Sequence, residues 1–356
     1  MKRIGLTTAL IFLFPVASLA APADDLFSPA VKQADSEIQQ GHLKEGMAIL
    51  RAAAATGEPS AEYALAHYLD KGMGHAEPAG AKGGYIVQGI GNEDHAEAAR
   101  LMSVAAGQGY PLAQLELGWQ YEIGNSLPRH PRLARDYFAA VEGKGAPSGR
   151  RGAARANAGL GSWAGFAPGA EEAQADQKLV IQDYAAAAPL YRRAAEGGSP
   201  SAAYEYGVLC ARGQGVAKSD DEARRWLLAS AQKGYPPAQF ELGQSKLLPD
   251  AERLSWLTKA SDAGSPLADY WLGQSKLQGR DGTAKDEAGG WVLLRKAADH
   301  HETFAKLVLA NAYLKGDVPG IPQDRDKAMS LTIEAAEDGN PIAAEFLGVL
   351  AAGRRK

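Results

Sequence analysis

One phrase occurs twice in the chain, 36 residues apart, and it limits the possible folds more than any other feature. The first copy is Gly198-Ser-Pro-Ser-Ala-Ala-Tyr-Glu-Tyr-Gly207, and the second is Gly234-Tyr-Pro-Pro-Ala-Gln-Phe-Glu-Leu-Gly243. A period of roughly 35 to 45 residues is typical of helical-hairpin repeats. The phrase therefore predicts a solenoid, in which each hairpin buries its apolar face against its neighbours.

The same pattern recurs over most of the chain. It becomes visible when the repeats are aligned on the residue between one hairpin and the next, which we call the turn residue. Proline stands two positions after this turn residue in seven of eight cases, and a small residue stands four positions after it. A glycine that closes one helix before a proline opens the next is expected at a tight helix–helix turn. The eight turn residues are Gly57, Gly109, Gly145, Gly198, Gly234, Gly264, His301 and Gly339.

This pattern resembles the Sel1-like repeat family, a relative of tetratricopeptide repeats. The best match to the family signature consists of Ala202-Ala-Tyr204-Glu-Tyr206-Gly207, Gly213-Gln-Gly215-Val216, Ala223-Arg-Arg-Trp226, Ser230-Ala231 and Gly234. The resemblance implies an all-α, right-handed α/α superhelical solenoid of about seven hairpins with a helix at each end. It also implies that the first helix of each hairpin lines the concave side. Such repeats are adaptors whose ligand depends on surface residues.

The ends of the chain read differently from the repeats. Lys2 and Arg3 precede an apolar run and a small-residue cleavage site that ends at Ala20, as in a secretory signal peptide. We therefore expect an exported, periplasmic protein that is not inserted in the membrane. The expected organisation is a signal peptide at 1–20, an N-terminal capping helix within 21–43, a solenoid at 44–351 and a basic tail at 352–356.

Two turn-to-turn spacings are 52 and 53 residues, which predicts loop insertions near 75–91 and 162–178. Both are expected between the first and second helix of a repeat, so they would project from one edge of the solenoid. Their aromatic residues Tyr85, Trp163 and Phe166 are candidates for binding a partner. The alternative is that both insertions are loops without a function.

Charge and cysteine content exclude some classes of protein. Without Lys2 and Arg3, 36 basic residues face 42 acidic ones, a net charge of −6, and nucleic-acid binding needs a clustered basic surface. The single cysteine, Cys210, excludes an internal disulfide framework. We expect no nucleic-acid partner.

Catalytic patterns are missing from the sequence. The seven histidines form no ligand spacing on one helix face, and the pair His300-His301 is expected to lie in a solvated turn. Cys210 is expected to be a buried packing residue, and Asp220-Asp221 to begin a helix. We therefore predict no catalytic residue, no metal site, no cofactor and no enzymatic activity.

A column of equivalent positions on the first helices is the expected partner-binding surface. It is acidic in the middle and apolar toward the C-terminus, and exposed aromatic residues are typical anchors of protein interfaces. The alternatives are that the glutamates only solvate the surface and that the apolar members pack under the terminal helix. The column consists of Glu116, Glu205, Glu241, Trp271, Val308 and Phe346, seven positions after the turn residue, with Trp119 one helical turn beyond Glu116.

These inferences favour a non-enzymatic periplasmic protein that binds another protein. The family resemblance makes an immunity protein possible, which would neutralise a toxic, phospholipase-type effector delivered by type VI secretion. An alternative is a scaffold or regulator of envelope or exopolysaccharide machinery or of signalling. A hydrolase built on the repeat fold is a third hypothesis.

Overall fold

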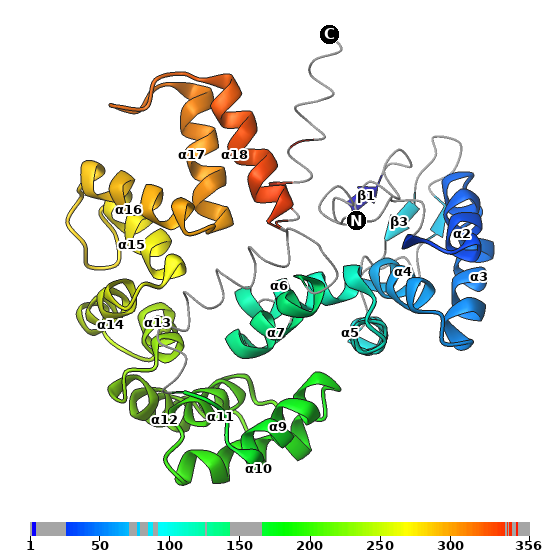
Figure 1. Ribbon diagram of the computed structural model, residues 1–356, viewed down its shortest axis with the longest axis horizontal. Helices are drawn as coiled ribbons and strands as arrows, with labels where there is room; N and C mark the ends of the chain where they lie inside the picture. The colour runs from blue at the N-terminus through cyan, green and yellow to red at the C-terminus, as the bar shows by residue number, and fades with distance from the viewer. Residues whose placement is uncertain are drawn as a thin grey trace.

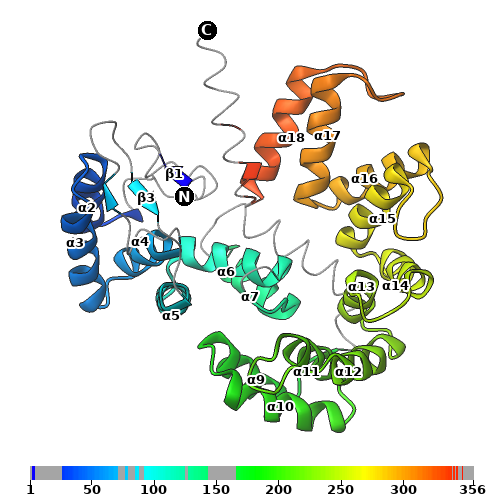
Figure 2. The ribbon, with the colours of Figure 1, turned by 180° about the vertical axis from the view of Figure 1, so that it is seen from behind.

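The computed structural model shows helical hairpins that follow one another along a curve (Figure 1). It describes residues 2–4, 26–70, 77–78, 85–87, 92–124, 127–142, 166–338, 340, 342–343 and 347. Seen from behind, α6 and α7 lie between the N-terminal helices and the remaining arc (Figure 2). The helices in these ranges are α2 (Pro29–Gln39), α3 (Leu43–Ala55), α4 (Pro59–Asp70), α5 (Asn92–Gly107), α6 (Pro111–Ile123), α7 (Pro131–Glu142), α9 (Ala170–Val180), α10 (Tyr184–Glu196), α11 (Pro200–Arg212), α12 (Asp220–Gln232), α13 (Pro236–Gln244), α14 (Asp250–Asp262), α15 (Pro266–Gln278), α16 (Glu287–Asp299), α17 (Thr303–Lys315) and α18 (Arg325–Glu337).

The described helices form eight hairpins, each of which packs against the next wherever both are joined by a short turn. The predicted all-α fold is confirmed. The helix expected to cap the N-terminus by itself, α2, instead pairs with α3 as a hairpin. No described helix has the length and apolar character needed to cross a bilayer.

The turn residues have the backbone conformation that a tight turn requires. The five described turn glycines have φ between 82° and 98°, which costs a residue without a Cβ little. His301 has φ 62°, in the same left-handed region, so it replaces glycine at this turn as predicted. Gly145 and Gly339 lie outside the described residues.

The small residues of the repeat lie where helices approach most closely. All seven alanines four positions after a described or predicted turn residue are 0% exposed: Ala61, Ala113, Ala202, Ala238, Ala268, Ala305 and Ala343. Because these side chains are small, the backbones of neighbouring helices come close enough to exclude water.

A buried polar contact recurs one position further along, and the sequence analysis did not anticipate it. Gln114 Nε2 donates to the carbonyl of Ala106 at 3.1 Å, and Gln239 Nε2 donates to the carbonyl of Ala231 at 3.3 Å. In both cases the acceptor lies eight residues earlier, in the last turn of the preceding helix. Each of these helix-end carbonyls also accepts the N–H of the turn glycine, Gly109 at 2.9 Å and Gly234 at 3.0 Å, so the glutamine supplies a second bond.

The predicted insertions have different structures. Within 75–91 the strands β2 (Glu77–Pro78) and β3 (Tyr85–Val87) pair with each other, and β1 (Lys2–Ile4) pairs with the other edge of β3. All pairs are antiparallel.

The second insertion was predicted as a loop at 162–178, and this is wrong for 170–178. These residues form most of α9, the first helix of the hairpin with α10. Its first turn carries Glu171 and Glu172, whose negative charge favours a helix start. The prediction failed because Gly145 was taken as the turn residue of this repeat. The 53 residues from Gly145 to Gly198 then left 162–178 as an apparent insertion, although 170–178 belong to a regular first helix.

Candidate functional site

A pocket of about 370 Å³ lies where the C-terminal end of α6 meets the first helices of four later hairpins. Residues of α11, α13, α15 and α17 line it together with Arg129, from the segment between α6 and α7. The contributing positions lie three, six, seven, ten and fourteen residues after a turn residue, which is one face of a helix. We call this cavity the inner pocket.

Aromatic rings form one side of the inner pocket and connect distant helices. The ring centre of Phe304 lies 5.9 Å from that of Tyr270 and 5.8 Å from that of Trp119. Trp119 belongs to α6 and Phe304 to α17, so helices far apart in the sequence touch. Trp271 packs edge-on against Tyr270, with ring centres 5.7 Å apart.

Two arginines lie at the end of the inner pocket nearest α6. Arg129 Nε donates to the carbonyl of Glu122 at 2.9 Å, and Arg212 Nη2 donates to the carbonyl of Gly124 at 2.7 Å. These carbonyls end α6, where the helix dipole is negative. The guanidinium carbon of Arg129 lies 4.3 Å from the ring centre of Phe240.

One donor of Arg129 has no acceptor in the described part of the chain. The residue is 8% exposed, and its buried Nη1 has no hydrogen-bond partner among the described residues. Glu241 lines the same pocket, where burial raises the pKa of its carboxyl while Arg129 and Arg212 partly oppose the shift. The inner pocket thus combines aromatic walls with two positive charges and one weakened negative charge.

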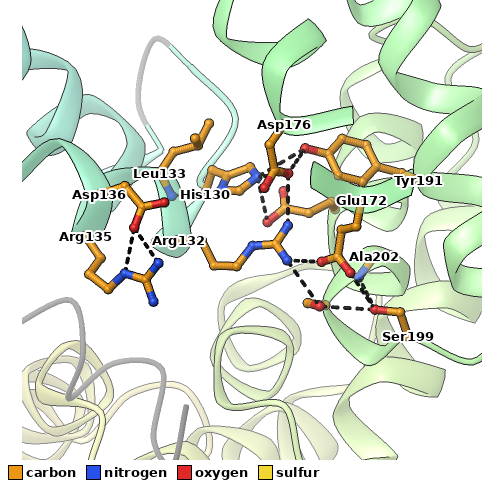
Figure 3. Close-up of polar contacts among 12 residues, drawn as sticks. His130, Arg132, Leu133, Arg135, Asp136, Glu172, Asp176, Tyr191, Ser199 and Ala202 are labelled. Atoms are coloured by element: carbon orange, nitrogen blue, oxygen red, sulfur yellow. Dashed lines mark hydrogen bonds and ion pairs between the residues drawn. The ribbon is translucent and has the colours of Figure 1, made fainter. Parts of the chain in front are cut away.

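A buried cluster of charges joins α7 to the hairpin that follows it (Figure 3). Arg132 is 1% exposed and contacts Glu172 through Nη1 and Asp176 Oδ1 through Nη2, the latter at 2.9 Å. Ser199 donates to the second oxygen of Glu172 at 2.8 Å, and Tyr191 donates to Asp176 Oδ1 at 2.6 Å. We call these side chains, together with His130 and Glu205, the junction cluster.

The protonation states in the junction cluster follow from its hydrogen bonds. His130 Nδ1 accepts from the backbone N–H of Leu133 at 3.2 Å, so the proton of the neutral ring is on Nε2, 3.2 Å from Asp176 Oδ1. Burial favours a raised pKa for Asp176, but His130, Arg132 and Tyr191 outweigh it and lower the pKa. Burial raises the pKa of Glu205 well above its ordinary value. The junction cluster is therefore an ion pair beside a carboxyl that favours its neutral form.

A second cavity, of about 390 Å³, lies between α4, α5, α6, the start of α10 and Gln214, which follows α11. Glu116 lines it, and so do His67 and His95, whose Nδ1 lies 2.9 Å from Asp70 Oδ1. Among the residues that the structure describes, no group of three or more His, Cys, Asp or Glu could hold a metal ion.

The structure separates the predicted column of partner-binding residues. Glu241 and Trp271 both line the inner pocket, whereas Glu116 lines the second cavity. The expectation of exposure is wrong for Glu205 and Trp119, which are 1% and 5% exposed. The carboxyl of Glu205, on the first helix α11, is therefore buried in the core beside the irregular junction between α7 and α9.

Of the remaining candidates, Val308 and Phe166 have described side chains, and neither lines the inner pocket. Val308 is half-buried against the core of α16, α17 and α18, as the packing alternative predicted. The ring of Phe166 packs against Tyr235, with centres 5.2 Å apart. Tyr85 lies on β3, but its side chain is outside the described residues, and so are Trp163 and Phe346.

Sequence reasoning missed the two arginines of the inner pocket and the whole junction cluster. Arg212 lies fourteen positions after a turn residue, on the same helix face as the column, so extending the column by one more turn finds it. Arg129 and Arg132 follow no repeat position. The expectation for Cys210 is confirmed, because it is 2% exposed and burial raises the pKa of its thiol.

The chain has the features of a helical-hairpin repeat protein of the tetratricopeptide-like class. These features are successive hairpins, turn residues with left-handed backbone conformation, and a pocket lined by the first helices. A family model described as "Sel1 repeat" matches residues 111–140, 173–199, 200–235, 266–301 and 304–340. The chain is a Sel1 repeat protein, and such proteins are generally protein-binding scaffolds.

Two solved structures are similar to this chain. One is a protective antigen present in uropathogenic Escherichia coli strains that displays an SLR fold, with 23% identity over 90% of this chain and a TM-score of 0.42. This chain spans 63% of the length of that protein. Another is a Sel1 repeat protein from Oxalobacter formigenes, with 26% identity over 91% of this chain and 90% of the other, and a TM-score of 0.40. A search of curated proteins gave no significant match.

Proposed function

We propose that this chain is an exported, non-catalytic protein that binds another protein through its inner pocket. The observation that carries the proposal is the convergence of five first helices, from α6 to α17, on one cavity lined by aromatic and charged side chains. Apolar cavities with a few convergent polar groups are the usual binding sites of proteins. Trp271 offers the large, half-buried aromatic surface that anchors interfaces.

A binding role is favoured over catalysis by the composition of the inner pocket. Its lining, as far as the chain is described, contains no histidine, cysteine or serine, so a Ser–His or Cys–His pair of nucleophile and base is lacking there. Glutamate and arginine hold charge in place, which suits recognition.

The finer proposal is that the partner is a toxic, phospholipase-type effector of type VI secretion and that this chain is its immunity protein. The support is the predicted signal peptide at 1–20 together with the family resemblance. A role as a scaffold or regulator of envelope or exopolysaccharide machinery is the alternative outcome.

The test is a protection experiment. Cells that make a candidate phospholipase-type effector, directed to the periplasm, should survive only when this chain is also exported. Trp271→Ala should abolish protection, while Trp256→Ala on α14 should preserve it, since Trp256 lies outside the inner pocket. Protection that is independent of Trp271 would move the interface elsewhere. Association with polysaccharide-export proteins without protection would favour the scaffold, and turnover of ester or amide substrates would contradict a non-catalytic role.

A further inference from the structure

The inner pocket contains a donor for which the described part of the chain supplies no acceptor. Arg129 is nine-tenths buried and its Nε donates to the carbonyl of Glu122, but its Nη1 has no partner among the described residues. A buried N–H without an acceptor is costly, and nearly all such groups in native proteins are paired. A ligand that enters the inner pocket can supply the acceptor that the described residues do not.

The charges of the pocket favour an anionic acceptor. Arg129 and Arg212 both bond to the end of α6, at Glu122 and Gly124, so their guanidiniums are gathered at one end of the cavity. Glu241 is the only carboxylate among the lining residues that the structure describes. Two arginines against one carboxylate leave room for one more negative charge, and charge-assisted bonds to arginine are the strongest available.

The apolar part of the pocket lies beside these charges. The ring of Phe240 supports the guanidinium of Arg129, and Tyr270, Trp271 and Phe304 complete the aromatic side. A planar guanidinium held on a ring presents its remaining N–H groups in a fixed direction. A ligand for this site must carry an apolar group and an anion close together.

We propose that the inner pocket binds the C-terminal residue of a partner polypeptide. The terminal carboxylate is held by Arg129 and Arg212, and an aromatic or large aliphatic last side chain lies among Phe240, Trp271 and Phe304. This inference rests on the proposed protein-binding function and specifies the chemistry of its ligand.

The end of a polypeptide fits the inner pocket better than a segment whose chain continues on both sides. A volume of about 370 Å³ is at the small end of ligand pockets, which span roughly 300 to 1,000 Å³. The contact between Trp119 and Phe304 also bridges α6 and α17 beside the pocket. A terminal residue carries its carboxylate and its side chain on one Cα, so both reach the cavity without a chain continuing past this contact.

Fluorescence anisotropy with labelled hexapeptide pools tests the proposal. The pools have the form Gly-Ser-Gly-Ser-X-Z, with X randomised and Z fixed as Phe, Leu, Trp or Ser, each made with a free carboxylate and with an amide. We expect pools that end in Phe, Leu or Trp with a free carboxylate to bind about tenfold or more tighter than their amides, as loss of a charge-assisted bond implies. Equal binding of the amides, a preference for Ser, or no binding of any pool would overturn the proposal. A further amidated pool with Asp at Z distinguishes an acidic side chain, and its preferential binding would also overturn it.

Variants assign the effect to the pocket. Arg129→Gln and Arg212→Gln should each weaken binding of the carboxylate pools by about tenfold and leave binding of the amides unchanged. Glu241→Gln should strengthen binding, because it removes the competing negative charge. Arg192→Gln, an exposed arginine on α10 paired with Glu196, is the matched control and should have no effect.

If Arg129→Gln does not fold, the opposite effects of Arg212→Gln and Glu241→Gln still decide the question. Failure here, with Trp271-dependent protection retained, overturns the carboxylate site and leaves the proposed function intact.

Discussion

The junction between α12 and α13 and the junction between α7 and α9 join neighbouring hairpins in opposite ways. At the first, Gly234 turns the chain with φ 83°, and Gln239 adds one neutral hydrogen bond to the carbonyl of Ala231. At the second, residues 143–169 stand between the two helices in the sequence, and Arg132 of α7 contacts Glu172 and Asp176 of α9. Where the repeat register is kept, packing of small residues is sufficient. Where it is broken, buried charges connect the hairpins, and their contribution depends on pairing and on pH.

Removing the central charge should have the largest effect. Arg132→Met leaves Glu172 and Asp176 buried without their counter-ion, which costs about 3–5 kcal/mol. Urea denaturation followed by circular dichroism measures the loss of unfolding free energy. Arg193→Met, which breaks the exposed pair with Glu171, should cost no more than about 1 kcal/mol. Similar losses in both variants would mean that the junction cluster does not hold the hairpins together.

A regular hairpin should respond to steric change instead. A Cβ at Gly243 would lie 2.9 Å from Leu257 Cβ and 3.1 Å from its backbone nitrogen. We expect Gly243→Ala to cost about 1–3 kcal/mol, because α14 must move away from α13. The control is Gly107→Ala at the end of α5, where nothing lies within 4 Å and stability should be unchanged or rise by up to about 1 kcal/mol. A neutral outcome for Gly243→Ala in thermal denaturation would show that the helices have room to separate.

The recurring glutamine bond should contribute a smaller and uniform amount. Gln239→Ala and Gln114→Ala each remove one neutral bond to a helix-end carbonyl, at a cost of about 1 kcal/mol. Because the two bonds have the same geometry, equal losses in urea denaturation are expected. Clearly different losses of unfolding free energy in the two variants would mean that the surroundings of each bond, rather than its position in the repeat, determine its contribution.

The last expected effect is a change in the pH dependence of stability at the irregular junction. The pKa of Glu205 is raised in the folded protein by burial, so the unfolded chain releases this proton first as the pH rises. Folding stability from this group is complete below the ordinary pKa of glutamate and is lost as the pH rises toward the folded-state pKa. Glu205→Gln removes this loss, so its stability relative to the native protein should increase between pH 5 and pH 8. Glu196→Gln, at an exposed ion pair, is the control. A difference that stays constant over this range would contradict a buried neutral carboxyl.

Most of the fold was predictable because its determinants are local and repeated. A left-handed turn residue, a proline and a buried alanine recur at fixed spacing, and even His301 was placed correctly without being glycine. Trp271 and Glu241 were found for the same reason, since equivalent positions of a repeat face the same side.

What escaped prediction depends on contacts between residues that no repeat position relates. α9 was taken as an insertion because the spacing from Gly145 was long. The approach of Arg132 to Glu172, and of Arg129 to Phe240, depends on how hairpins are rotated relative to each other, and a linear pattern does not contain that rotation. For this reason Glu205 looked exposed from its position in the repeat and is buried in the structure.

The contact between Trp119 and Phe304 has a consequence for how the molecule comes apart. A solenoid with neighbour contacts alone can fray from either end, one unit at a time. Here α17, in the hairpin with α18, packs against α6 from the first half of the chain. Loosening α17 therefore uncovers part of α6, so an array that looks linear unravels more cooperatively than its repeats alone would dictate.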